Sequence, residues 1–204
     1  MKVLMIGSYP TEGCGISKYT EELLESLIDY NVDVTSKRIF FFKDKLTLFK
    51  WIRILSAIVR DKPNIIHIQY TPPICGPYFP VFLLLLQFLF RGEVKAVITA
   101  HEKPSTYYRH LNGPIKILFK VYEQIVLRYC SAVIVHIDEH KFEILENYTV
   151  EDDKIWTIPH CVMDNITPNA DITKRFIETN NLSNRCIITT LGFIRPSKGI
   201  EFLL

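Results

Sequence analysis

The stretch that decides the fold opens the chain: Lys2-Val-Leu-Met-Ile-Gly7, a loop over residues 8–12, and then Gly13-Cys-Gly-Ile16. Apolar residues at consecutive positions are typical of a strand buried on both faces of a parallel sheet. A glycine loop and a helix after such a strand begin a strand–helix–strand unit. A second unit of this kind starts at Cys186-Ile-Ile-Thr-Thr-Leu-Gly192. We therefore predict one α/β domain followed by the start of another.

Short β-branched runs alternate with longer helical stretches between these two units. We predict strands over 2–6, 32–38, 65–69, 96–100, 132–137, 155–158 and 186–191. We predict helices over 16–29, 46–60, 78–91, 113–130 and 138–147, and a short helix near 170–180. Strand–helix alternation with right-handed crossovers gives a doubly wound, Rossmann-like parallel sheet.

The expected domain organisation has three parts. Residues 1–165 form the first domain, 166–184 a linker, and 185–204 the truncated start of a second domain. The segment before the second glycine loop is rich in Asn, Asp, Thr and Pro, as linkers are.

Composition excludes several classes of protein. The chain has 204 residues, of which 48% are hydrophobic, and its net charge of +2 does not indicate a nucleic-acid binder. Its five cysteines have no zinc-type spacing, which predicts reduced, mostly buried thiols. The first strand starts at Lys2, so no signal peptide is expected before it. The apolar run 79–90 is too short to cross a bilayer and is predicted to be a buried helix.

The first loop is a candidate phosphate site. Gly13, Gly15 and the amide of Ile16 lie beyond the carboxyl end of a strand, where a helix N-terminus offers free N–H groups. The dinucleotide fingerprint fits poorly because it needs glycine where Lys18 stands, and a Walker loop is absent. An NAD(P)-dependent oxidoreductase stays open as an alternative, since Lys37 and Arg38 could meet a 2′-phosphate.

The order of several segments resembles family 4 glycosyltransferases of the GT-B fold. The matching segments are Pro10-x-x-Gly13-Cys-Gly-Ile16-x-x-Tyr19, Lys62-Pro-Asn-Ile-Ile-His-Ile-Gln69, Ala96-Val-Ile-Thr-Ala-His-Glu102, Ser131-Ala-Val-Ile-Val135, Lys154-Ile-Trp-Thr-Ile-Pro159 and Leu191-Gly-Phe-Ile-Arg-Pro-Ser-Lys-Gly199. The resemblance covers essentially the whole chain and implies the N-terminal, acceptor-side half of a GT-B enzyme.

The resemblance implies transfer of a sugar from a nucleotide-diphospho-sugar to an acceptor hydroxyl, with retention of configuration and without a metal or other cofactor. His101, at the end of a strand, is the expected catalytic residue, with Glu102 and Tyr70 on the acceptor side. Arg195 and Lys198 on the second loop are expected to neutralise the donor diphosphate. The family usually places Arg where Phe193 stands. His67 and His136 are predicted to be packed, hydrogen-bonded groups.

The fragment alone is expected to be inactive, because the donor domain is incomplete. A non-catalytic binding half-domain also stays open as an alternative. Residues 43–62 hold six Lys/Arg among large apolar residues, which predicts possible peripheral contact with an anionic membrane. The expected acceptor is a glycan or a lipid-linked acceptor. The expected location is cytoplasmic, with possible attachment to the inner membrane face.

Overall fold

The computed structural model describes residues 1–7, 15–38, 47–108, 111–160, 169–183 and 185–188. The chain divides into two units, Met1–His160 and Cys161–Leu204. The first unit contains the sheet. The predicted domain limits at 165 and 185 stay predictions.

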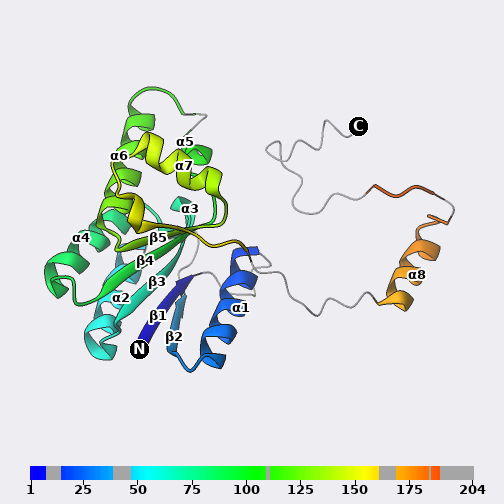
Figure 1. Ribbon diagram of the computed structural model, residues 1–204, viewed down its shortest axis with the longest axis horizontal. Helices are drawn as coiled ribbons and strands as arrows, with labels where there is room; N and C mark the ends of the chain where they lie inside the picture. Colours follow the sequence, from blue (N-terminus) through cyan, green and yellow to red (C-terminus); the bar gives the residue numbers. More distant parts are fainter. Residues whose placement is uncertain (8–14, 39–46, 109–110, 161–168, 184, 189–204) are drawn as a thin grey trace. The chain divides into compact units, whose positions relative to one another are not determined.

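A six-stranded parallel sheet forms the centre of the first unit (Figure 1). Its strands are β1 (Lys2–Gly7), β2 (Asp33–Arg38), β3 (Ile65–Tyr70), β4 (Lys95–Ala100), β5 (Ala132–Val135) and β6 (Ile155–Thr157). Their order is β2-β1-β3-β4-β5-β6, and every neighbouring pair is parallel. The strand order reverses beside β1, and ligands in such sheets bind beyond the carboxyl ends of the strands at that point. The predicted Rossmann-like α/β fold is confirmed.

Helices connect the strands, as the sequence predicts. They are α1 (Gly15–Asp29), α2 (Thr47–Asp61), α3 (Pro72–Cys75), α4 (Phe79–Phe90), α5 (Ser105–Tyr108), α6 (Gly113–Tyr129) and α7 (Asp138–Asn147), with the 3₁₀ helix η2 (Asp152–Lys154) before β6. The short helices α3 and α5 were not predicted. Both follow the carboxyl end of a strand, where loops and site residues concentrate in this fold.

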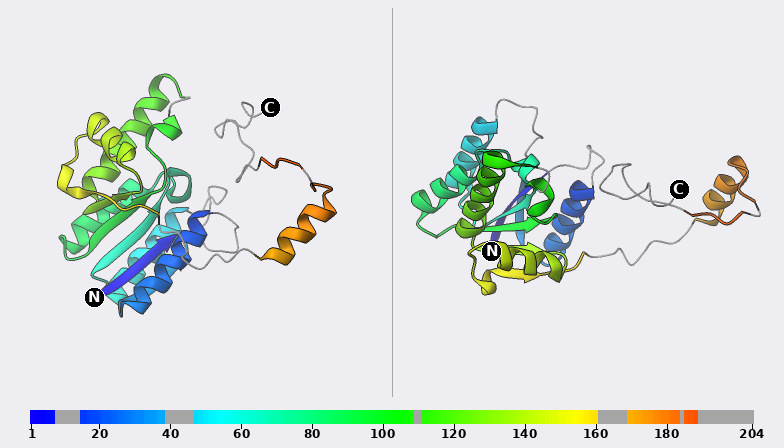
Figure 2. Two further views of the ribbon diagram at one scale, coloured as in Figure 1. Left: turned by 45° about the vertical axis from the view of Figure 1, so that its right-hand side comes forward. Right: turned by 90° about the horizontal axis from the view of Figure 1, so that it is seen from above.

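The two faces of the sheet differ in chemistry because side chains alternate along each strand. One face is apolar and packs on α2, α4 and α6, which lie side by side, while α1 lies on the other face of β1 and β2 (Figure 2). The apolar face carries Leu4, Ile6, Ile66, Ile68, Ile98 and Val133. The α1 face carries Met5, His67, Gln69 and Thr99, which are buried.

An aromatic cluster anchors the apolar face. Trp51 on α2 stacks on Phe79 at 5.1 Å between ring centroids, and its indole N–H donates to the carbonyl of Cys75 at 3.1 Å. Both rings are almost fully buried. Helix α4 is only half-buried, which corrects the prediction of a buried helix: its other side exposes Val81, Phe88 and Leu89. Within the described residues, no helix is long and apolar enough to span a membrane.

The second unit contains one described helix, α8 (Ala170–Thr179). The side chain of Asn169 caps it by accepting from the backbone N–H groups of Asp171 and Ile172, both at 3.1 Å. The predicted helix near 170–180 is therefore confirmed. Residues 186–188, the described part of the predicted strand 186–191, are not in a strand. Residues 189–191 lie outside the described part of the chain.

Candidate functional site

Three histidines gather at the carboxyl edge of the sheet. His101 directly follows β4, His136 directly follows β5, and His160 lies three residues beyond β6. One ring nitrogen of each lies within 4.8 Å of those of the other two. Parallel pairing explains the gathering, because it brings the carboxyl ends of neighbouring strands to one edge.

His101 is fixed by its neighbour on β3. Its Nε2 lies 2.8 Å from Oε1 of Gln69, whose amide nitrogen in turn faces the sulfur of Met5 at 3.4 Å. A carbonyl oxygen only accepts, so Nε2 carries the proton and Nδ1 keeps a free lone pair. Burial, with smaller effects from His136 and His160, lowers the pKa of His101 to about 3. His101 is therefore neutral at pH 7 and can accept a hydrogen bond from a hydroxyl.

The beginning of α1 reaches this cluster through Tyr19. The Tyr19 ring meets His101, His136 and His160 edge-on, at centroid distances of 5.2, 5.2 and 4.9 Å. Tyr19 lies about one turn from Gly15, the first residue of the helix. The N-terminal turns of α1 and the histidine cluster thus lie at the same edge of the sheet, as the sequence predicts for a ligand site there.

The predicted phosphate-binding residues are only partly described. Gly15 is exposed, and a Cβ placed on it would meet no atom of the residues that the structure describes within 4 Å. Ile16 is half-buried and packs against the core. Gly13, Arg195 and Lys198 lie outside the described residues, and their phosphate roles stay predictions.

A glycine at the end of β1 makes room for the side chain that holds His101. Gly7 is buried, and a Cβ there would lie 3.0 Å from Cγ of Gln69 and 3.2 Å from Oγ1 of Thr20. These distances are shorter than normal carbon contacts. The size of residue 7 therefore controls the position of Gln69, and through it that of His101.

The other histidines differ from their sequence-based interpretation in part. His67 is buried and bonded to Oγ1 of Thr99 at 2.7 Å, as predicted. His136 donates from Nδ1 to the carbonyl of Ile158 at 3.0 Å, but its buried Nε2 has no hydrogen-bond partner among the residues that the structure describes. Only one of the two ring nitrogens of His136 is therefore hydrogen-bonded, which corrects the prediction that His136 is a packed, hydrogen-bonded group. No role was predicted for His160, although its place after the last strand of the domain indicated this edge.

The two predicted acceptor-side residues have different environments. Glu102 is exposed beside His101 at the edge of the sheet. Tyr70 is 4% exposed, and its hydroxyl donates to Oε1 of Glu123 at 2.9 Å in the core. That hydroxyl already has an acceptor, so the structure gives Tyr70 a packing role. Direct contact of either residue with an acceptor stays a prediction.

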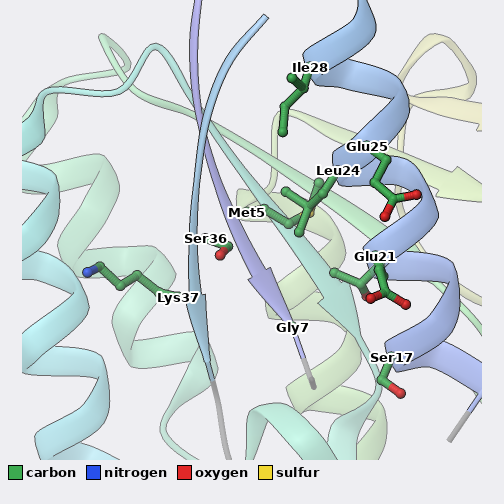
Figure 3. A pocket seen from close by; sticks show the side chains of 10 residues that line it. Met5, Gly7, Ser17, Glu21, Leu24, Glu25, Ile28, Ser36 and Lys37 are labelled. Carbon is green, nitrogen blue, oxygen red and sulfur yellow. The ribbon is translucent and has the colours of Figure 1, made fainter. Parts of the chain in front are cut away.

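A cavity of about 200 Å³ runs between α1 and the strands β1 and β2 (Figure 3). Glu21 and Glu25 line it from α1, and the Lys37 side chain extends away from α1. Two carboxylates repel a phosphate, so this cavity does not suit the 2′-phosphate of NADP. The cavity therefore gives no support to the NADP form of the oxidoreductase alternative.

Comparisons with known proteins identify the same architecture. A family model described as Glycosyltransferase Family 4 matches residues 13–165. The Anabaena protein HepE, solved with UDP and glucose, superposes with a TM-score of 0.65 at 14% identity, over 100% of this chain and 56% of its own. An alpha-glucosyltransferase solved with UDP superposes with a TM-score of 0.55 at 14% identity, over 79% of this chain and 44% of its own. No curated protein sequence matches.

The chain therefore spans about half the length of these solved structures. At this identity the likeness shows the fold: a Rossmann-like sheet of the kind found in GT-B glycosyltransferases.

Proposed function

The chain belongs to Glycosyltransferase Family 4, and on that basis we propose that the whole protein transfers a sugar from a nucleotide-diphospho-sugar to an acceptor hydroxyl. The two superposed proteins, HepE and the alpha-glucosyltransferase, were solved with UDP, which favours a nucleotide-linked donor. We propose further that transfer retains the anomeric configuration and needs no metal. We propose that the 204-residue chain alone is inactive, since it spans about half the length of these structures.

The observation that carries the proposal is the meeting of α1 and His101 at one edge of the sheet, through Tyr19 at 5.2 Å. This meeting gives one site two complementary properties. The first turn of α1 offers backbone N–H groups and the positive end of a helix dipole. His101 offers a neutral imidazole with a fixed tautomer.

These properties match the two ends of the donor. The amides of Gly15 and Ile16 are suited to the diphosphate, and we propose that Arg195 and Lys198 add positive charge to it. Negative charge builds up on the diphosphate as the sugar leaves, so fixed donors and cations there lower the barrier. Nδ1 of His101 is suited to accept a hydrogen bond from a sugar hydroxyl. We place Glu102 on the acceptor side, and we propose that Tyr70, whose hydroxyl is bonded to Glu123, supports that side by packing and not by direct contact.

Release of nucleoside diphosphate by the full-length protein, measured over a panel of UDP- and GDP-sugars, tests the function. One donor should give turnover, and His101→Ala should lower kcat/KM by about 100-fold or more, since one preorganised hydrogen bond in an active site is typically worth about 10²–10³-fold. The matched control is His140→Ala, because His140 lies on α7 outside the cluster. No turnover with any nucleotide-sugar, or equal rates in both variants, would contradict the proposal.

The outer sides of the helices on the apolar face carry exposed apolar side chains, which favour contact with a membrane and so a lipid-linked acceptor. Phe49, Ile52 and Val59 on α2 are 62%, 47% and 59% exposed, and Arg53 beside them is also exposed. Helix α4 packs against both α2 and α6, and all three helices carry exposed apolar side chains: on α4 Leu84, Leu85, Phe88 and Leu89, and on α6 Ile117 and Leu118. Apolar residues with basic neighbours are suited to an anionic membrane surface. We propose this surface as the place of membrane contact predicted for 43–62.

Co-sedimentation of the chain with vesicles tests the membrane surface. We expect binding to anionic vesicles at low salt, weaker binding at high salt, and loss of binding in Phe49→Ser. Phe176→Ser is the matched control, because Phe176 on α8 is similarly exposed, at 57%. Absence of binding at low salt would remove the membrane contact while leaving the transferase proposal intact.

A further inference from the structure

The three histidines at the sheet edge have one property that sugar transfer does not require. His101, His136 and His160 come from three neighbouring strand ends, and their ring nitrogens lie within 4.8 Å of one another. Hydrogen bonding of a sugar needs one imidazole, and the other two therefore call for a separate explanation. Three imidazole rings around one point can together coordinate a metal ion.

In two of the rings, one nitrogen donates a hydrogen bond to a carbonyl oxygen, which leaves the other nitrogen with a lone pair. His101 donates from Nε2 to Oε1 of Gln69 at 2.8 Å, so its Nδ1 carries a lone pair. His136 donates from Nδ1 to the carbonyl of Ile158 at 3.0 Å, so its Nε2 carries a lone pair. A histidine that ligates a metal typically has its other nitrogen bonded to a carbonyl or carboxylate in this way.

The bare nitrogen of His136 is the strongest indication of a missing ligand. Its Nε2 is buried and has no hydrogen-bond partner within the described part of the chain, and the residue is only 6% exposed. Leaving such an atom unsatisfied costs free energy, which a ligand at that position would recover.

We propose that His101, His136 and His160 form a binding site for a divalent transition-metal ion with affinity for imidazole, with Zn²⁺ as the ion to test. Imidazole nitrogen suits Zn²⁺, Cu²⁺ and Ni²⁺ better than Mg²⁺ or Ca²⁺. Three protein ligands leave a fourth position of a tetrahedral ion open to water or to an incoming hydroxyl.

The charge of a neighbouring side chain also favours a cation at this place. The carboxylate of Glu22 on α1 acts electrostatically on His160, which places a negative charge near the cluster.

Binding requires one ring to move. Ligands of a tetrahedral zinc ion lie about 3.3 Å apart, given Zn–N bonds of about 2.0–2.1 Å, whereas the three nitrogens here span up to 4.8 Å. The rings of His136 and His160 are also stacked at 3.7 Å between centroids. His160 is the exposed member of the group, so we expect it to turn towards the other two.

The site has a consequence for transfer that rests on the proposed function. A metal ion on His101 occupies the lone pair that would otherwise accept a sugar hydroxyl. Bound Zn²⁺ should therefore inhibit the full-length enzyme, and His160→Ala should relieve this inhibition. The binding experiment below needs no activity, so it tests the metal site even if the protein is not a transferase.

Titration calorimetry of the 204-residue chain with Zn²⁺, after treatment with a chelator, tests the site. We expect one saturable ion per chain. His160→Ala should weaken binding at least tenfold, and because His160 is exposed, the variant should keep its fold. His140→Ala is the matched control and should bind like the unaltered chain. With Co²⁺ in place of Zn²⁺, visible absorption should show imidazole coordination.

Two results would overturn the proposal. One is the absence of a saturable site in the folded chain. The other is an affinity of His160→Ala equal to that of the unaltered chain, because the bound ion would then lie elsewhere. Co²⁺ absorption that vanishes in His136→Ala, in a variant shown by circular dichroism to be folded, would support the site independently.

Discussion

A buried carboxyl in the apolar core should make the stability of this chain depend on pH. Glu123 on α6 is 1% exposed, and its Oε1 accepts a hydrogen bond from the hydroxyl of Tyr70 at 2.9 Å. Its Oε2 is buried and has no hydrogen-bond partner in the described ranges of the chain. Burial raises the pKa of Glu123 from 4.5 to about 7, against a smaller lowering by the Tyr70 hydrogen bond.

The direction of the effect follows from the higher pKa in the folded state. Between 4.5 and about 7 the folded chain holds the proton more tightly than the unfolded chain does. The contribution of Glu123 to stability is therefore fully present below its unfolded pKa and is lost as the pH rises through its folded pKa. With about 1.4 kcal/mol for each tenfold change in proton affinity, the loss between roughly pH 5 and pH 8 is on the order of 2–3 kcal/mol.

Urea unfolding of the unaltered chain and of Glu123→Gln, over this pH range, measures the effect. Glutamine keeps the shape and the acceptor for Tyr70 but cannot ionise. As the pH rises, the difference in unfolding free energy should move by roughly 2–3 kcal/mol in favour of the variant, or about 5–10 °C in melting temperature. Burial lowers the pKa values of His67 and His101, but these groups act on both proteins alike and cancel in the difference.

Glu146→Gln, on the exposed side of α7, shows what replacement of a surface carboxylate does under the same conditions. A difference between the chain and Glu123→Gln that does not change with pH would refute this reasoning. It would mean that Glu123 is ionised at low pH or is reached by water.

Two further substitutions test the packing beside the site. Tyr70→Phe should lower the unfolding free energy by about 1.5–3 kcal/mol. It should also steepen the dependence of stability on pH, since the Tyr70 hydrogen bond lowers the pKa of Glu123. Urea titration at two pH values checks both effects, and unchanged stability would contradict the hydrogen bond. Gly7→Ala should lower the unfolding free energy by about 1–3 kcal/mol, because the new Cβ would press on Gln69. Thermal melting checks this, and an unaltered melting temperature would mean that Gln69 moves freely.

Much of the fold could be predicted because its strands are apolar at consecutive positions. Runs such as Val3-Leu-Met-Ile6 indicate burial on both faces, and the predicted strands of the first unit agree with β1 to β6 within a few residues at either end. The four-residue helices α3 and α5 were missed because a single turn has no hydrophobic period. The exposed side of α4 was missed for a related reason, since a helix that is apolar all round predicts burial.

The site was predicted less completely, because it depends on contacts between distant residues. The place of His101 follows from its position at a strand end, whereas its partner Gln69 lies 32 residues earlier. Pairing between β4, β5 and β6 brings His136 and His160 to it, and no local pattern indicates that convergence. Likewise, a glutamate on a helix predicts a solvated surface, so the buried Glu123 was not foreseen.

The central claim is that the edge of the sheet beside α1 and His101 holds the nucleotide-linked donor. A crystal structure of the full-length protein, with the nucleoside diphosphate of its active donor, tests this most directly. The account predicts the diphosphate within hydrogen-bond distance of the backbone N–H groups at Gly15 and Ile16, with His101 facing the space for the sugar. A diphosphate bound elsewhere, with this edge filled by protein side chains, would contradict it.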